Sequence, residues 1–365
     1  MKSIDQFRSE IIAAWKRIDP PRTVKVMEVC GTHTVAVSRS GLRDLLPEGL
    51  RLISGPGCPV CVTDQSYMDA AVWLARRPEV IVATYGDMLR VPGRDGSLEQ
   101  ARTEGASVEV VYSAAQSLAI AREHPGRHVV FLGIGFETTT PGAALAILQA
   151  QREGVENLSV FSTHKRLLPV MWALLAQDDL RIDAFLCPGH VSVILGWKVY
   201  EPIARGRGLP CVVAGFEDEN ILAGVLEIVR QIADGAPAAG TVYGPVTPDG
   251  NARAREVIDR VFVPRDDRWR GLGLVPDSGL GIRPEFARFD TEKRFGLPAF
   301  AGYELPGCRC GDVIAGRKLP PECPLFGVRC TPRDPVGPCM VSSEGSCAAY
   351  FRYHWRGKRP ASDGD

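Results

Sequence analysis

The sequence lacks an excess of either charge, a long apolar run and a glycine-rich phosphate loop. Its 365 residues contain 43 Lys and Arg and 43 Asp and Glu, so the formal net charge is zero at pH 7. Proteins that bind nucleic acid or anionic membranes gather basic residues, and this chain does not. No segment approaches the roughly 18 uninterrupted apolar residues of a membrane span, and no Walker-type motif is present. The sequence therefore predicts neither nucleic-acid nor membrane binding.

The first 22 residues also lack a secretory signal, because charges interrupt their apolar stretch and no small-residue cleavage site follows. They predict an amphipathic helix over about 4–18, and we expect a cytoplasmic protein. Eleven cysteines are many for such a protein. Since a reducing compartment keeps thiols unpaired, they indicate metal binding or thiol redox chemistry more than structural bridges.

Short runs of apolar and β-branched residues alternate with helical stretches along the first two thirds of the chain. The runs are Val24–Cys30, Leu52–Ile53, Val80–Thr84, Val108–Tyr112, His128–Leu132, Leu158–Phe161, Ala184–Leu186 and Cys211–Ala214. Such alternation predicts βαβ units and parallel sheets. The last four runs repeat the spacing of the first four, which favours two similar parallel-sheet α/β domains.

The composition changes after this region. Gly235–Asn251 has the composition of a linker, a helix is expected over 252–261, and Gly271–Gly281 is interpreted as a segment returning to an earlier sheet. From Gly302 onward six cysteines occur between Cys308 and Cys347. This part buries too little apolar surface to fold unaided, so a metal centre is expected.

These features predict a series of boundaries. They are an N-terminal helix over 1–22, a first α/β domain over 23–120 joined by part of 255–300, a second over 121–240, a [4Fe-4S] cluster domain over 301–356 and a disordered tail over 357–365.

The cysteine spacing at the C-terminus is typical of an iron-sulfur site. Four thiolates follow the pattern Cys323-x6-Cys330-x8-Cys339-x7-Cys347, which suits a [4Fe-4S] cube whose irons take ligands from a loop winding round it. Structural zinc sites more often use paired CxxC knuckles. A zinc-bound or merely thiol-rich segment remains the alternative, and Cys308 and Cys310 compete for the same four places.

Two further cysteine motifs follow expected strands. Cys58-Pro-Val-Cys61 precedes a helix, where a dithiol has a lowered pKa and can form a disulfide, although a structural or zinc-bound CxxC is the alternative. Cys30-Gly-Thr-His33 offers a soft thiolate and an imidazole that could hold a transition metal. A buried structural cysteine and a histidine bonded to the backbone are its alternative. Glu137 is a candidate acid or base, or else a loop hydrogen-bonder.

Several long sequence motifs link these features to one family. They are Met27–Thr34 (MEVCGTHT), Ser54–Cys61 (SGPGCPVC), Gly135–Thr139 (GFETT), Cys187–Ser192 (CPGHVS), Pro321–Gly327 (PECPLFG) and Pro335–Tyr350 (PVGPCMVSSEGSCAAY). Together they resemble the HypD family of hydrogenase formation proteins over nearly the whole chain.

The resemblance implies a [NiFe] hydrogenase maturation factor, a redox-active scaffold on which an Fe(CN)2CO group is assembled. It implies that Cys30 anchors this iron, with His33 as second ligand or proton partner. Cys58 and Cys61 would relay electrons with a [4Fe-4S] cluster. On this reading Glu137 is also part of the catalytic set.

The resemblance also implies partners. These are a HypC-type small chaperone and a HypE-type protein that donates cyanide from a thiocyanate, and the chain by itself is expected to be a monomer. Without the resemblance, an iron-sulfur-dependent thiol-disulfide reductase is the nearest rival, and a zinc-stabilised binding scaffold is a third reading.

Overall fold

The computed structural model describes residues 2–355, so the tail expected over 357–365 lies outside the described residues. The chain divides into two compact units. Unit 1 comprises the described residues up to 58, residues 171–251 and those from 307 onward, and unit 2 comprises residues 59–170 and 252–306. Each unit is thus assembled from segments that are distant in the sequence.

Unit 1 contains a five-stranded parallel sheet in the order β2-β1-β7-β8-β9. Its strands are β1 (Val24–Glu28), β2 (Leu50–Ser54), β7 (Ala184–Pro188), β8 (Cys211–Ala214) and β9 (Ala239–Thr241). Its helices are α1 (Ile4–Trp15), α2 (Gly31–Arg39), α9 (Gly189–Leu195), α10 (Glu201–Arg207), α11 (Asp218–Asp234), α14 (Cys310–Ile314), α15 (Pro338–Val341) and α16 (Ser346–Tyr353). Helix α8 (Leu167–Leu175) spans the chain position where unit 2 gives way to unit 1.

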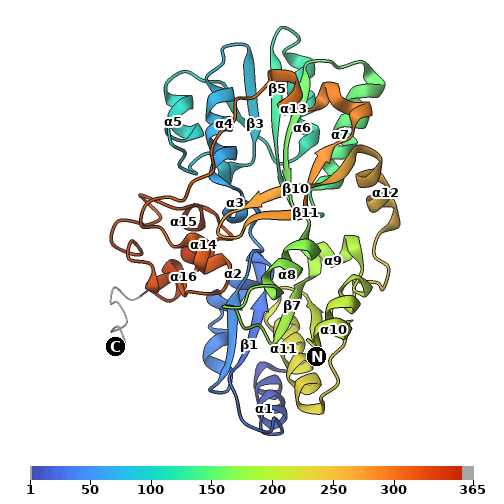
Figure 1. The fold of residues 1–365 in the computed structure, drawn as a ribbon, viewed down its shortest axis with the longest axis vertical. Helices are drawn as coiled ribbons and strands as arrows, with labels where there is room; N and C mark the ends of the chain where they lie inside the picture. Colours follow the sequence, from blue (N-terminus) through green and yellow to red (C-terminus); the bar gives the residue numbers. More distant parts are fainter. Residues whose placement is uncertain (1, 356–365) are drawn as a thin grey trace. The chain divides into compact units, whose positions relative to one another are not determined.

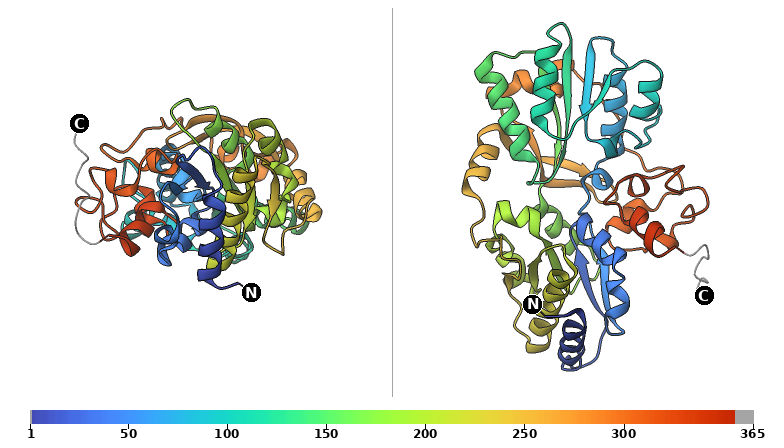
Figure 2. Two further views of the ribbon diagram at one scale, coloured as in Figure 1. Left: turned by 90° about the horizontal axis from the view of Figure 1, so that it is seen from below. Right: turned by 180° about the vertical axis from the view of Figure 1, so that it is seen from behind.

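The core of unit 1 lies between this sheet and its helices. The long helix α11 turns one apolar face inward and packs on β8, while α1 lies beside α11 (Figures 1 and 2). Val26, Leu186 and Val212, one from each of three neighbouring strands, are all buried in this core. Helix α16 packs on α2, so the C-terminal segment lies against the helix that follows β1.

Unit 2 contains a four-stranded parallel sheet in the order β4-β3-β5-β6 and an antiparallel hairpin. Its strands are β3 (Val80–Thr84), β4 (Val108–Val110), β5 (His128–Gly135), β6 (Leu158–His164), β10 (Phe262–Trp269) and β11 (Gly273–Ile282). Its helices are α3 (Pro59–Val62), α4 (Gln65–Ala75), α5 (Leu98–Thr103), α6 (Ala114–Glu123), α7 (Thr140–Glu153), α12 (Ala252–Val261) and α13 (Thr291–Phe295).

The predicted elements form, but they group differently from the expected boundaries. All eight predicted strands are present in parallel sheets, which confirms an α/β fold, and the helices expected at 4–18 and 252–261 are α1 and α12. However, β3 and β4 pair with β5 and β6, whereas β1 and β2 pair with β7 and β8. A βα alternation looks the same whether the next strand stays in one sheet or enters another, so the sequence could not reveal these exchanges.

Two further differences concern the last third of the chain. Residues 271–281 do not return to an earlier sheet, because most of them form β11, which pairs with β10. The cysteine-rich segment from residue 307 groups with unit 1 and does not form a compact unit of its own. Among residues 2–355, no helix is both long and apolar enough to cross a membrane.

Candidate redox and metal site

Cys30 lies where β1 ends and α2 begins. Its backbone is extended at the N-cap position of α2, and its side chain makes no capping hydrogen bond, although the nearby Thr32 and His33 act to lower the pKa of the thiol. Burial and the nearby Glu344 carboxylate nevertheless raise the pKa of Cys30 to about 11. The thiol is therefore protonated in this environment unless a cation balances the thiolate, as a bound metal ion would.

His33 presents a free nitrogen on the same helix. Its Nε2 lies 2.9 Å from the carbonyl oxygen of Gly215, and because a carbonyl only accepts, Nε2 carries the hydrogen and Nδ1 the lone pair. Nδ1 is buried and has no hydrogen-bond partner among the described residues. Burial lowers the pKa of His33 to about 4. A neutral imidazole with one nitrogen fixed by a carbonyl is the form that binds metals.

The loop that carries the CxxC motif lies against Cys30. A Cβ atom on Gly57 would lie 2.3 Å from both the Cα and the backbone nitrogen of Cys30, so only glycine permits this approach. The next residue, Cys58, is buried. Cys58 and Cys61 are disulfide-bonded, whereas the other nine cysteines are free. The structure thus brings Cys30 and Cys58, two predicted site residues, together within unit 1.

Two polar residues between the last cysteines belong to this site, and no motif had assigned them a role. Thr32 Oγ1 donates to Glu344 Oε1 at 2.7 Å, and the Glu344 amide donates to Ser342 Oγ at 3.2 Å. Ser342 Oγ lies 3.3 Å from Cys58 Sγ, and because that sulfur is in a disulfide, the hydroxyl is the donor. Glu344 and Ser342 lie within the family motif at 335–350, but their spacing does not distinguish them from the other residues of that motif.

Six thiols of the C-terminal segment line one cavity. They are Cys308, Cys310, Cys323, Cys330, Cys339 and Cys347, with Phe326 and Met340 beside them. Burial raises the pKa values of Cys308, Cys330 and Cys339, so these sulfurs become thiolates only with a compensating cation. Within residues 2–355, no three His, Cys, Asp or Glu side chains are arranged to hold a single metal ion. Six thiols around one cavity suit the dispersed ligands of a cluster better than one zinc ion.

The sulfur of Cys339 lies close to two others of the six, those of Cys310 and Cys347. The Sγ atoms of Cys310 and Cys339 are 2.6 Å apart, which is shorter than an ordinary nonbonded contact between sulfurs and approaches the separation of a disulfide. Ligands at different corners of a bound cube lie farther apart than this, so a cluster held by both residues would require the two sulfurs to separate. The remaining four thiols are those of Cys308, Cys323, Cys330 and Cys347. This short distance is relevant to which four of the six cysteines could bind a cluster.

Glu137 lies in unit 2, in the turn after β5. Its Oε1 accepts a hydrogen bond from the Leu167 amide at 2.9 Å, while Oε2 is buried without a partner among the described residues. Burial raises the pKa of Glu137 to about 7. A carboxyl with such a pKa can give or take a proton near neutrality, so an acid or base role for Glu137 stays a prediction.

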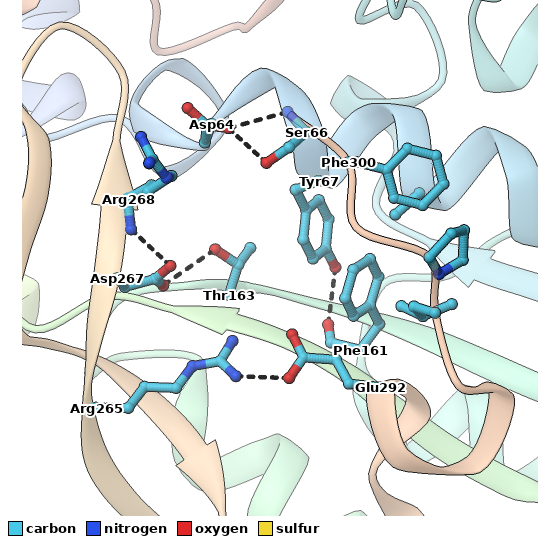
Figure 3. Close-up of a pocket in the computed structure, with 13 residues that line it drawn as sticks. Asp64, Ser66, Tyr67, Phe161, Thr163, Arg265, Asp267, Arg268, Glu292 and Phe300 are labelled. Atoms are coloured by element: carbon cyan, nitrogen blue, oxygen red, sulfur yellow. Dashed lines mark hydrogen bonds and ion pairs between the residues drawn. The ribbon is translucent and has the colours of Figure 1, made fainter. Parts of the chain in front are cut away.

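A separate cavity of about 290 Å3 lies in unit 2 and contains none of the predicted site residues. Figure 3 shows its aromatic side, where Tyr67 stacks on Phe161, and its charged side, where Arg265 pairs with Glu292 at 2.7 Å. Arg268 lines the same cavity. Arg265 and Glu292 are paired with each other, Asp267 accepts from Lys165, and Asp64 accepts from Ser66.

Comparison with known proteins assigns this sequence to a family. The family model HypD, described as "Hydrogenase formation hypA family", matches residues 3–354. The hydrogenase maturation factor HypD of Azotobacter vinelandii is 47% identical over 97% of this chain and 97% of its own length. The hydrogenase expression/formation protein HupD of Azotobacter chroococcum is equally similar over the same shares.

The HypD protein of Escherichia coli K12 is 46% identical over 91% of this chain and 90% of its own length. The matches cover both units and the cysteine-rich segment. The chain therefore belongs to the HypD family of hydrogenase formation proteins.

Proposed function

We propose that this protein acts in [NiFe] hydrogenase maturation as a thiol-based scaffold on which the Fe(CN)2CO group is assembled. In this proposal the iron is the substrate, Cys30 is its anchor and His33 Nδ1 is its second protein ligand. The support is local: a buried thiol that needs a cation and a buried imidazole nitrogen without a partner lie within one turn of α2. The names of the relatives supply the hydrogenase context.

The observation that carries the proposal is a series of contacts within unit 1 that links Cys30, Cys58 and the end of α15. Gly57 lies against the backbone of Cys30, Cys58 follows it in the chain, and Ser342 Oγ touches Cys58 Sγ. Ser342 directly follows α15, the helix that carries Cys339. The proposed anchor, Cys58 and the helix that carries Cys339 are therefore joined by successive contacts within unit 1.

The disulfide gives the site a two-electron couple. A thiocyanate RSCN and a dithiol yield RSH, HCN and a disulfide: the S–C bond breaks, an S–S bond forms, and both protons come from the thiols. In the dithiol state, Cys58 and Cys61 would supply the two electrons and two protons that the release of one cyanide requires. The disulfide observed here is then the state that follows one such event.

The thiols around the C-terminal cavity are suited to hold a [4Fe-4S] cluster, which when bound would supply electrons singly. We propose Cys323, Cys330 and Cys347 as ligands, as the spacing predicts, and Cys308 as the fourth in place of Cys339. The short contact between Cys310 and Cys339 supports this exchange.

The proposal includes two partners, a small HypC-type chaperone that shares the iron and a HypE-type donor of cyanide. Family membership supports both partners.

Infrared spectroscopy of the protein copurified anaerobically with its HypC-type chaperone tests the proposal. We expect cyanide and carbonyl stretching bands in the wild type and their loss in Cys30→Ala, with the iron and sulfide of the C-terminal cluster retained. Cys211→Ala is the matched control, because Cys211 is also a free, buried thiol of unit 1 but lies in β8.

Bands that persist in Cys30→Ala would show that another group holds the iron. A wild-type complex that has redox-active thiols but never shows these bands would favour the thiol-disulfide reductase instead.

A further inference from the structure

A buried arginine closes the end of the short helix that carries Cys61. Arg270 Nε donates to the carbonyl oxygen of Cys61 at 3.0 Å, and its Nη2 donates to that of Thr63 at 2.7 Å. The Arg270 amide donates to the Val62 carbonyl oxygen at 2.9 Å. Helix α3 ends at Val62, so the arginine satisfies carbonyls that a helix leaves without partners at its C-terminus.

The position of Arg270 is itself fixed by the hairpin. Thr63 forms an antiparallel bridge with Trp269, whose ring is buried and whose Nε1 donates to Ser278 Oγ at 2.7 Å. Gly271 then turns the chain with a φ of 73°, a conformation that favours glycine. Arg270 therefore cannot leave the Cys61 backbone without disturbing the end of β10.

The charge of Arg270 has no carboxylate partner. The side chain is 6% exposed, and it forms no salt bridge with any described residue. Asp64, the carboxylate nearest to Cys61 in the sequence, is engaged at the N-terminus of α4, where it accepts from the Ser66 amide and hydroxyl. A buried guanidinium beside Cys61 that binds only carbonyls is a positive charge without a fixed counterion.

We infer that Arg270 is a positioning residue for the CxxC couple, holding the Cys61 backbone and favouring a thiolate at Cys61 when the disulfide is reduced. Reduction breaks the S–S bond with two electrons, and one proton suffices if one sulfur remains a thiolate. With one thiol and one thiolate, the release step proposed above yields RSH and cyanide as CN⁻ in place of HCN, so it balances with a single thiol proton. A cation bonded to the backbone of Cys61 favours a thiolate on that residue and so stabilises the reduced form relative to the disulfide. This inference rests on the proposed function, in which the couple turns over.

The test titrates the full-length protein with dithiothreitol and counts reduced Cys61 by alkylation and mass spectrometry of its peptide. We expect Arg270→Met to shift the dithiol-disulfide equilibrium about tenfold toward the disulfide, equivalent to about 30 mV. It should also slow alkylation of reduced Cys61 at pH 7. Arg270→Lys, which keeps the charge, should restore most of both effects.

Arg268→Met is the matched control, because Arg268 lies two residues away on β10 and is not bonded to α3. A thermal unfolding curve of each variant reports any general loss of stability. If Arg270→Met and Arg270→Lys shift the equilibrium equally, or neither shifts it, the electrostatic role is wrong. If Cys61 in the wild type cannot be reduced at all, the proposed function fails instead.

Discussion

At the scale of single residues, burial shifts the pKa values of the two candidate ligands in opposite directions. It lowers the pKa of His33 to about 4 and raises that of Cys30 to about 11. At pH 7 both are therefore neutral in the absence of iron. Binding a cation would remove the proton of Cys30 and would find His33 Nδ1 already free, so the two residues complement each other as ligands.

Glu137 allows this effect of burial to be measured in unit 2. Its pKa is about 7 when folded and 4.5 in its ordinary state, so the folded state binds more protons and the free energy of unfolding falls as the pH rises from about 4.5 to 7. Glu137→Gln should remove this decline and leave the variant more stable than the wild type at pH 8, by up to about 3 kcal/mol.

Urea unfolding between pH 4.5 and 8, followed by fluorescence, measures the difference. Substitution of the exposed Glu109 by Gln should leave the slope of stability against pH unchanged. An identical slope for wild type and Glu137→Gln would mean that Glu137 is ionised when folded, and its role as an acid or base near neutrality would lose its basis.

At the scale of elements, α14, α15 and α16 decide which cysteines can meet. Spacing alone favours the last four cysteines because Cys308 and Cys310 are close in sequence to each other and far from the rest. In the structure Cys310 begins α14 and Cys339 lies in α15, and their sulfurs are in contact. Contacts between helices are not encoded by spacing, so the set of Cys323, Cys330, Cys339 and Cys347 that the spacing favours stays a prediction.

This pairing gives a prediction that separates the two ligand sets. Cys308→Ala should lose the iron and acid-labile sulfide of the anaerobically purified protein, whereas Cys339→Ala should retain both. The reason is that a cluster loses a corner ligand in the first variant and only a neighbouring thiol in the second. Metal and sulfide analysis decides between the sets. Cluster loss in Cys339→Ala with retention in Cys308→Ala would restore the set that the spacing predicts.

At the scale of the whole molecule, local pattern was sufficient for elements and insufficient for their grouping. The alternation of β-branched runs with helical stretches predicted eight strands. The motifs in the loops that follow these strands indicated Cys30, His33 and Cys58 as site residues. The exchange of β3 and β4 into the sheet of β5 depends on packing between distant segments. Arg270 and Glu344 were missed for the same reason, because each acts on a residue more than 200 positions away.

The same organisation predicts where removal of iron will be felt. Residues from 307 to 345 contain only the short helices α14 and α15 and a 3-10 helix at Pro320–Glu322, and α16 packs on α2. If a cluster holds this segment together, its removal by an anaerobic chelator should loosen α16 and, through that contact, α2. Amide hydrogen exchange in both helices should then rise about tenfold, which corresponds to a loss of about 1.4 kcal/mol in local stability.

Helix α7 of unit 2, which contains no cysteine, is the internal control. Unchanged exchange in α16 after complete loss of iron would show that the segment is held by protein contacts alone, whereas faster exchange confined to α16 and α2 would tie the metal to the helix that carries His33.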